Sequence, residues 1–261
     1  MSEYEVALYI HGPITVKGRI TLREPKGQNP DDPFHSDISL TKTQYGVLAT
    51  LTARTDADST NAKDEMLATK AALHFLGQTL DVLALDIRRP LYLSLLDRPK
   101  GWPKEHRQRL FVAQDSWHSA FNGSRVLGER HTADFLRALS WYRKGQYTED
   151  PLDKFLAFWN SIEGVATKYA PRDNCTGRMA TKCYVWESFK LVWGRCEQWP
   201  VIPGESGWID EYYNTRKDIA HGAMSVSIRR IETVLERLDS IEAVAHRFLS
   251  DWRAQQIRLV R

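Results

Sequence analysis

The sequence predicts a mainly α-helical protein, in which a small α+β module precedes an all-α helical bundle. In the first part of the chain, short apolar runs separated by Gly/Pro turns lead into one long helical pattern, which is typical of an α+β module. In the second part, apolar residues recur at the spacing of helix faces. The average composition, with 42% hydrophobic and 26% charged residues over 261 positions, excludes a disordered or collagen-like chain.

The N-terminal module is predicted to contain an antiparallel sheet. A Gly-Pro pair at 12–13 and a Pro- and Gly-rich stretch at 25–30 separate short apolar segments, and such segments favour strands. The predicted strands cover residues 4–10, 14–22, 37–40, 46–54 and 91–95.

One long helix is predicted between the last two of these strands. It opens at Thr60 or Asn61, has the acidic residues Asp64 and Glu65 in its first turn, and ends before Pro90. Its predicted apolar stripe comprises Met66, Leu67, Leu73, Leu76, Leu80 and Leu83.

A change of pattern near residue 100 predicts two domains. Residues 97–103 hold two Pro and one Gly, a composition that favours a connecting segment. We therefore place an α+β domain at residues 1–96, a linker at 97–104 and a helical domain at 105–261.

The helical domain shows start and stop signals for several helices. Thr132 and Asp150 are expected to be N-caps, Pro151 suits the first helical position, and Gly222 suits a left-handed position after a helix end. The predicted helices cover residues 132–144, 151–168, 181–197, 208–221 and 228–252.

Charge and cysteine content narrow the functional classes. A net charge of +3 argues against broad, charge-driven nucleic-acid binding, although a compact cleft that meets a few phosphates is compatible with it. Three Cys in a chain of this length argue against a disulfide scaffold, and their spacing is unlike that of zinc modules, so we expect ordinary thiols and no metal.

The same features predict where the protein works. The N-terminal sequence MSEYEVALYI lacks a basic region, so we expect no secretory signal, and no window is apolar enough for a membrane span. We therefore expect a cytoplasmic protein. Phosphate-binding and dinucleotide-binding motifs are absent from the sequence, and we expect no cofactor. All nine Trp follow residue 100, where they suit a helical core, a dimer interface or a base-stacking surface.

The segment Arg216-Lys-Asp-Ile-Ala-His-Gly222 is the strongest candidate for chemistry. Taken alone, it suits an ordinary helix end, because His221 near a helix C-terminus interacts favourably with the helix dipole and Gly222 supplies the left-handed cap. Arg216 and His221 lie about 140° apart around an ideal helix, so they do not share one face.

This segment resembles the Arg-x4–6-His signature of HEPN domains, and is most similar to the Apea-like and methylamine-utilisation J-type group. A second segment, residues 150–163, resembles the helix that precedes the motif in those proteins, where an aromatic-rich run leads to an apolar-Glu pair. Together the two segments place the resemblance over about residues 105–255.

The resemblance implies a metal-independent endoribonuclease. HEPN domains commonly pair as homodimers, so that His221 of one chain would face Arg216 of the other. The ribose 2′-OH would attack the adjacent phosphate and leave a 2′,3′-cyclic phosphate, with His221 exchanging the proton and Arg216 contacting the phosphoryl oxygens. Such proteins often act in prokaryotic antiviral defence or toxin systems.

Further site residues are assigned with this resemblance. Lys217 stands where family members often have Asn, Asp or His, and Asp218 is the nearest polar substitute, which we expect to orient His221 or Arg216. Lys217 is expected to contact phosphate, or else to be solvated. Asn160 and Glu163 on the preceding helix are expected either to reach the RNA-binding cleft or to make a partly buried polar contact between helices.

The alternative is a non-catalytic HEPN-like scaffold that binds a partner protein or a nucleotide through the same cleft. In that case Arg216 and His221 would serve the structure alone. For a latent ribonuclease that needs an activator, the N-terminal domain is the expected place for control by a regulatory partner protein.

Overall fold

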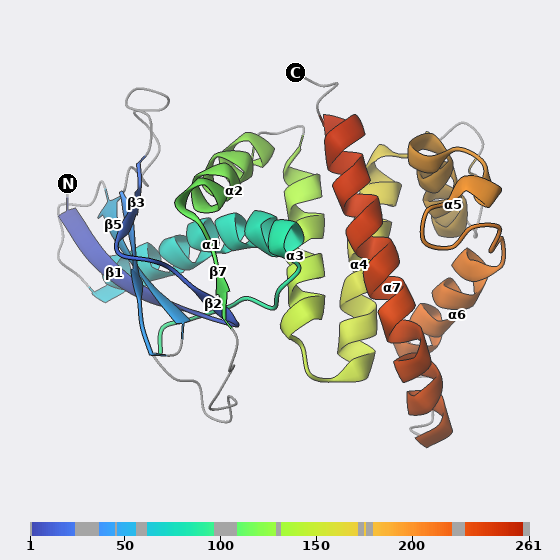
Figure 1. The fold of residues 1–261 in the computed structure, drawn as a ribbon, viewed down its shortest axis with the longest axis horizontal. Helices are drawn as coiled ribbons and strands as arrows, with labels where there is room; N and C mark the ends of the chain where they lie inside the picture. The colour runs from blue at the N-terminus through green and yellow to red at the C-terminus, as the bar shows by residue number, and fades with distance from the viewer. Residues whose placement is uncertain are drawn as a thin grey trace. The chain divides into compact units, whose positions relative to one another are not determined.

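The computed structural model describes residues 2–23, 37–44, 46–55, 62–96, 109–128, 132–171, 175, 180–220 and 228–257. The chain divides into two units, residues 1–125 and 126–261. The first unit combines a small antiparallel sheet with helices and the second is built of helices, so the predicted fold class is confirmed (Figure 1). Within the described residues, no helix is both long and apolar enough to cross a membrane.

The main sheet of the first unit is antiparallel and has the strand order β3-β4-β5-β1-β6. Its centre is the ten-residue pairing of β1 with β5, in which Val6 lies opposite Leu51. The strands are β1 (Ser2–His11), β3 (Ile20–Leu22), β4 (Ile38–Lys42), β5 (Gly46–Thr55) and β6 (Tyr92–Ser94).

The single strand predicted over residues 14–22 is divided in the structure. Gly18 adopts a left-handed backbone conformation with φ +71°, which glycine tolerates and which interrupts an extended chain. The segment before Gly18 forms β2 (Ile14–Thr15), which pairs in parallel with β7 (Leu110–Phe111).

The long helix α1 (Ala62–Ile87) packs against β1 and β5. Its buried residues follow helical spacing and include Ala68, Ala72, Leu76, Leu80 and Leu83. The prediction that Met66 and Leu67 belong to this stripe is wrong: the two side chains are 52% and 58% exposed, because they lie off the row that faces the sheet.

Residues 109–125 belong to the first unit, although the sequence placed the linker at 97–104. Helix α2 (Gln114–Leu127) is absent from the predicted helices, and it packs on α1. The ring of Phe121 lies edge-on to Phe75 at 5.7 Å, and the hydroxyls of Thr79 and Ser124 are 3.3 Å apart. These contacts and the β2–β7 pair shift the division of the chain to residues 125 and 126.

Helix α4 (Pro151–Tyr169) is the central helix of the second unit, and it packs against α3, α5, α6 and α7. Its buried face carries the aromatic residues Phe155, Phe158 and Trp159. The surrounding helices are α3 (Ala133–Tyr147), α5 (Ala180–Trp193), α6 (Trp208–Ala220) and α7 (Ile228–Gln255), and a short 3-10 helix η1 (Cys196–Gln198) follows α5 (Figure 1).

The helix ends test the predicted caps. Asp150 caps α4 as expected, because its carboxylate accepts hydrogen bonds from the backbone N–H groups of Leu152 and Asp153. Thr132 makes no side-chain cap; its hydroxyl donates to the carbonyl of Val126 instead. Helix α5 ends at Trp193 rather than near residue 197, since the following glycine adopts a left-handed φ of +78°.

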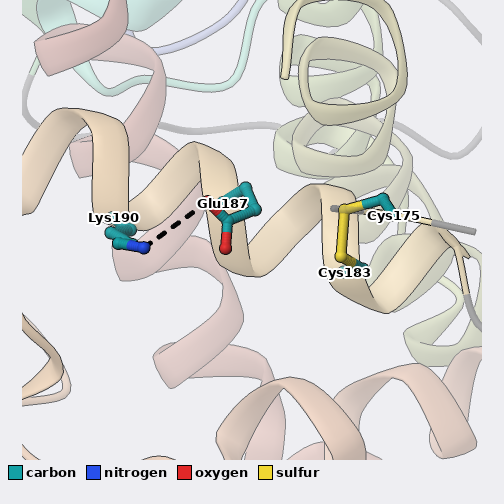
Figure 2. Close-up of a disulfide and its surroundings, with 4 residues drawn as sticks. All are labelled: Cys175, Cys183, Glu187 and Lys190. Carbon is teal, nitrogen blue, oxygen red and sulfur yellow. Dashed lines mark ion pairs between the residues drawn. A yellow bond between two sulfur atoms is a disulfide. The ribbon is translucent and has the colours of Figure 1, made fainter. Parts of the chain in front are cut away.

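The expectation of three ordinary thiols is wrong for two of them. Cys175 and Cys183 form a disulfide that joins the segment before α5 to the first turn of that helix (Figure 2). Cys196 is the remaining free cysteine. Because disulfides form in oxidising compartments, the cysteine content no longer supports the expected cytoplasmic location.

Candidate functional site

The candidate site lies where α4 and α6 pack through their aromatic residues. The rings of Phe155 and Tyr212 stack at 5.8 Å, and those of Trp159 and Trp208 stack at 6.3 Å. The two aromatic residues on each helix are four positions apart, so they lie on the same face of that helix. This aromatic seam fixes the two helices close to the position of Arg216.

A polar chain of three residues continues from this seam. The indole N–H of Trp159 donates a hydrogen bond of 2.5 Å to Glu163 Oε2, one turn further along α4. The same oxygen lies 3.4 Å from Nε of Arg216 on α6. The side chains of Glu163 and Arg216 are only 20% and 26% exposed, so the carboxylate and guanidinium attract each other in a partly water-excluded place.

The contact with Glu163 leaves much of the guanidinium available. Nε of Arg216 is buried and its geometry toward Glu163 is that of an ion pair rather than a hydrogen bond. The two terminal nitrogens make no hydrogen bond to any residue that the structure describes. Glu163 contacts the guanidinium at Nε and leaves its two terminal nitrogens accessible. Arginine binds phosphate through such a pair of N–H groups.

The other predicted site residues lie nearby without joining this contact. Lys217 and Asp218 follow Arg216 on α6, and both are exposed. Asn160 is half-buried on α4, one turn before Glu163. Among the described residues, no hydrogen bond or ion pair connects these three side chains with Arg216. His221 falls outside the described residues, directly after the last residue of α6.

Helix α6 is anchored on both sides by charged residues. Lys182 of α5 donates a 2.6 Å hydrogen bond to Asp210. Arg237 of α7 donates to the Thr215 hydroxyl and lies 3.5 Å from a carboxylate oxygen of Glu211. These contacts join the first turn and the middle of α6 to the helices α5 and α7.

The last helix offers less free positive charge than its sequence indicates. Arg237 is engaged with α6, and Arg247 donates a 2.6 Å hydrogen bond to Asp251. Both of these arginines are therefore occupied by contacts within the second unit. The side chains of Arg229 and Arg230 lie outside the described part of the structure.

Burial governs the protonation of the tyrosine in the seam. Burial raises the pKa of Tyr212 above its ordinary value, while hydrogen bonds with Ser240 and Trp208 and the charge of Arg237 act in the opposite direction. The phenol is therefore protonated near neutral pH and does not serve as a base.

Comparison with known proteins adds no assignment. Neither the protein-family models, nor the curated proteins, nor the solved structures contain a match to this chain. Within the part of the chain that the structure describes, no group of three or more His, Cys, Asp or Glu residues could hold a metal ion.

Sequence reasoning missed the residues that support Arg216. Trp159 was included among the nine Trp that suit a core, a dimer interface or a base-stacking surface, although its i, i+4 spacing to Glu163 permits the hydrogen bond that the structure contains. Thr215 and Arg237 were missed because their contact joins residues 22 positions apart on different helices. No local spacing rule indicates such a pair.

Proposed function

We propose that the second unit is a HEPN-like ribonuclease domain that cleaves RNA without a metal ion. One observation carries the proposal: Glu163 holds Arg216 by its Nε edge, while both terminal guanidinium nitrogens stay free of hydrogen bonds to the described residues. An arginine fixed in this way is suited to a phosphodiester, because its planar fork matches two phosphoryl oxygens.

The chemistry would need no nucleophile from the protein. The 2′-OH of the substrate attacks the neighbouring phosphorus, the 5′-oxygen leaves, and the products carry a 2′,3′-cyclic phosphate and a 5′-OH. Arg216 stabilises the charge that develops on the phosphoryl oxygens. His221 exchanges the proton, because an imidazole titrates near neutral pH. The pairing of two chains would supply Arg216 and His221 from opposite protomers.

Lys217 and Asp218 have supporting parts in this proposal. Lys217 is exposed on the same helix as Arg216 and would contact a flanking phosphate. Asp218 is also exposed and would orient His221 or Arg216, and Asn160 would line the cleft beside Glu163.

The rival function is a non-catalytic scaffold of the same fold, which would bind a partner protein or a nucleotide. The partial burial of the Glu163–Arg216 pair favours it, because an ion pair between two helices also serves to fix their packing. In that case the pair would matter for stability and not for turnover.

Cleavage of RNA in EDTA separates the two functions. Purified full-length protein is incubated with total RNA, and 5′-OH ends are detected by labelling with a polynucleotide kinase. We expect cleavage by the native chain in EDTA and a loss on the order of 100-fold or more in Arg216→Ala and His221→Ala. Arg137→Ala is the matched control, because Arg137 is an exposed arginine on α3 and no hydrogen bond or ion pair among the described residues joins it to Glu163 or Arg216.

Arg216→Lys refines the result. It keeps the positive charge and loses the planar fork, so we expect most of the activity to be lost while the fold is retained. Absence of cleavage by the native chain, with and without candidate partner proteins, would contradict the ribonuclease proposal and favour the scaffold. The homodimer is tested separately, by light scattering of the same preparations.

A further inference from the structure

A pocket of about 660 Å³ opens at the end of α5, at a place that the proposed ribonuclease function does not use. Its walls come from α5, from η1 and from the loop before α6. The volume falls within the range of about 300–1,000 Å³ that is usual for small-molecule sites. The pocket lies wholly within the second unit.

One wall of this pocket is aromatic. The rings of Trp186 and Trp199 meet edge to face at 4.9 Å, and both residues line the cavity. The indole N–H of Trp199 donates to the carbonyl of Gly194, so its polar edge is already satisfied and its remaining surface is apolar. Trp186 is only half-buried and can receive a flat ring against its surface.

Positive charge lies at the same pocket. Lys190 and Arg195 both line it, against one lining carboxylate, that of Glu197. Nζ of Lys190 forms an ion pair with Glu187 Oε2 at 3.7 Å, a separation longer than a hydrogen bond (Figure 2). The side chain of Lys190 is 60% exposed. Arg195 makes no side-chain hydrogen bond or ion pair with any residue in the described ranges, so its guanidinium is available.

The other polar side chains that line the pocket are the hydroxyl of Ser206 and the thiol of Cys196. Burial raises the pKa of the Cys196 thiol, and the nearby carboxylates of Glu197 and Glu205 raise it further, while a hydrogen bond with the backbone of Gly204 acts against them. The thiol is therefore neutral at pH 7 and adds no negative charge to the lining.

From the juxtaposition of this aromatic wall with an unpaired guanidinium, we infer that the pocket binds a planar aromatic carboxylate. The ring system would lie against Trp186 and the carboxylate would accept the paired N–H groups of Arg195, with Lys190 as a second cation. The binding is non-covalent, and the neutral Cys196 lies beside the ligand as a spectator.

The test measures binding of 2-naphthoate to the full-length protein by calorimetry. We expect saturable binding with a dissociation constant on the order of 10–100 μM, and at least tenfold weaker binding of the uncharged 2-naphthamide. Arg195→Gln should weaken 2-naphthoate about fivefold to tenfold, and Trp186→Ala by at least as much. Leu191→Ala is the matched control, because Leu191 is exposed on the same helix and does not line the pocket.

Cys196 provides a second readout that locates the ligand. It is the free cysteine, so iodoacetamide labels it selectively in the unreduced protein. Bound 2-naphthoate should slow this alkylation at least fivefold in the native chain and not in Arg195→Gln, whose exposed side chain can be changed without disturbing the fold.

Three results would overturn the inference. They are the absence of saturable binding at millimolar 2-naphthoate, equal affinity for 2-naphthamide, and an alkylation rate of Cys196 that the ligand does not change. None of these measurements depends on RNA cleavage, so the pocket and the ribonuclease proposal stand or fall separately.

Discussion

Replacing Glu163 by Gln isolates the ion pair that holds Arg216. The amide oxygen of Gln still accepts the indole hydrogen bond of Trp159, so the variant removes the charge and little else. At 3.4 Å and an effective dielectric constant of about 20, the Coulomb attraction of the pair is about 5 kcal/mol. Desolvation and the partial exposure of both side chains offset most of it, and we expect a net loss of about 1–2 kcal/mol.

A double-mutant cycle measures this quantity directly. The unfolding free energies of the native chain, Glu163→Gln, Arg216→Gln and the double variant are obtained from urea titrations. The control cycle removes the ion pair between Lys168 and Asp134, which is shorter at 2.8 Å but has side chains 54% and 48% exposed. We expect this exposed pair to contribute at most about 0.5 kcal/mol, because water screens it.

The comparison of the two cycles decides whether burial or distance governs the interaction. A coupling free energy for Glu163 and Arg216 that is no larger than that of the exposed pair would refute the reasoning. In the cleavage assay, Glu163→Gln should slow an RNA-cleaving protein about tenfold, because Arg216 loses its fixed position. Loss of stability with unchanged cleavage would show that the pair has a structural role alone.

Three further predictions follow from the second unit. A Cβ at Gly145 would lie 2.7 Å from the buried ring of Phe158. Gly145→Ala should therefore lower the free energy of unfolding by about 1–3 kcal/mol in urea titrations, despite the better helix propensity of alanine. An increase in stability would contradict this contact. The disulfide closes a loop with a sequence separation of 8, so replacing both of its cysteines by serine should lower the unfolding free energy by about 2.5 kcal/mol. A loss below about 0.5 kcal/mol would show that the disulfide contributes little to the stability of the unit. The Glu197 carboxylate helps to raise the pKa of Cys196, so Glu197→Gln should lower that pKa and speed alkylation at pH 8 about twofold or more, whereas an unchanged rate would refute the assigned cause.

The sequence predicted those parts of the fold that depend on local pattern. The fold class was correct, and α4 begins and ends within one residue of its predicted range, because Asp150 and Pro151 are strong start signals. The division into units was placed too early, because α2 is attached to α1 by contacts such as that between Phe75 and Phe121, which lie 46 residues apart. Local periodicity contains no information about such contacts.

The candidate site shows the same limit. The sequence singled out Arg216 and Glu163 separately, and the structure brings them together. Their contact depends on how α4 and α6 pack, which the aromatic pairs determine and which no spacing along the chain predicts. The disulfide was missed because a sequence separation of 8 does not by itself bring Cys175 and Cys183 to the Cα–Cα distance of 5.5 Å that the structure contains.

The parallel pairing of β2 with β7 has a consequence for the order in which the chain folds. Residues 14–15 find their partner only at residues 110–111, a separation whose closure is costly in chain entropy and slow. During synthesis, the first unit therefore waits for its last strand and for α2, which ends at Leu127, to leave the ribosome. A gene fragment that ends at residue 96 would encode the main sheet and α1 without the helix that packs on α1 and without the partner of β2.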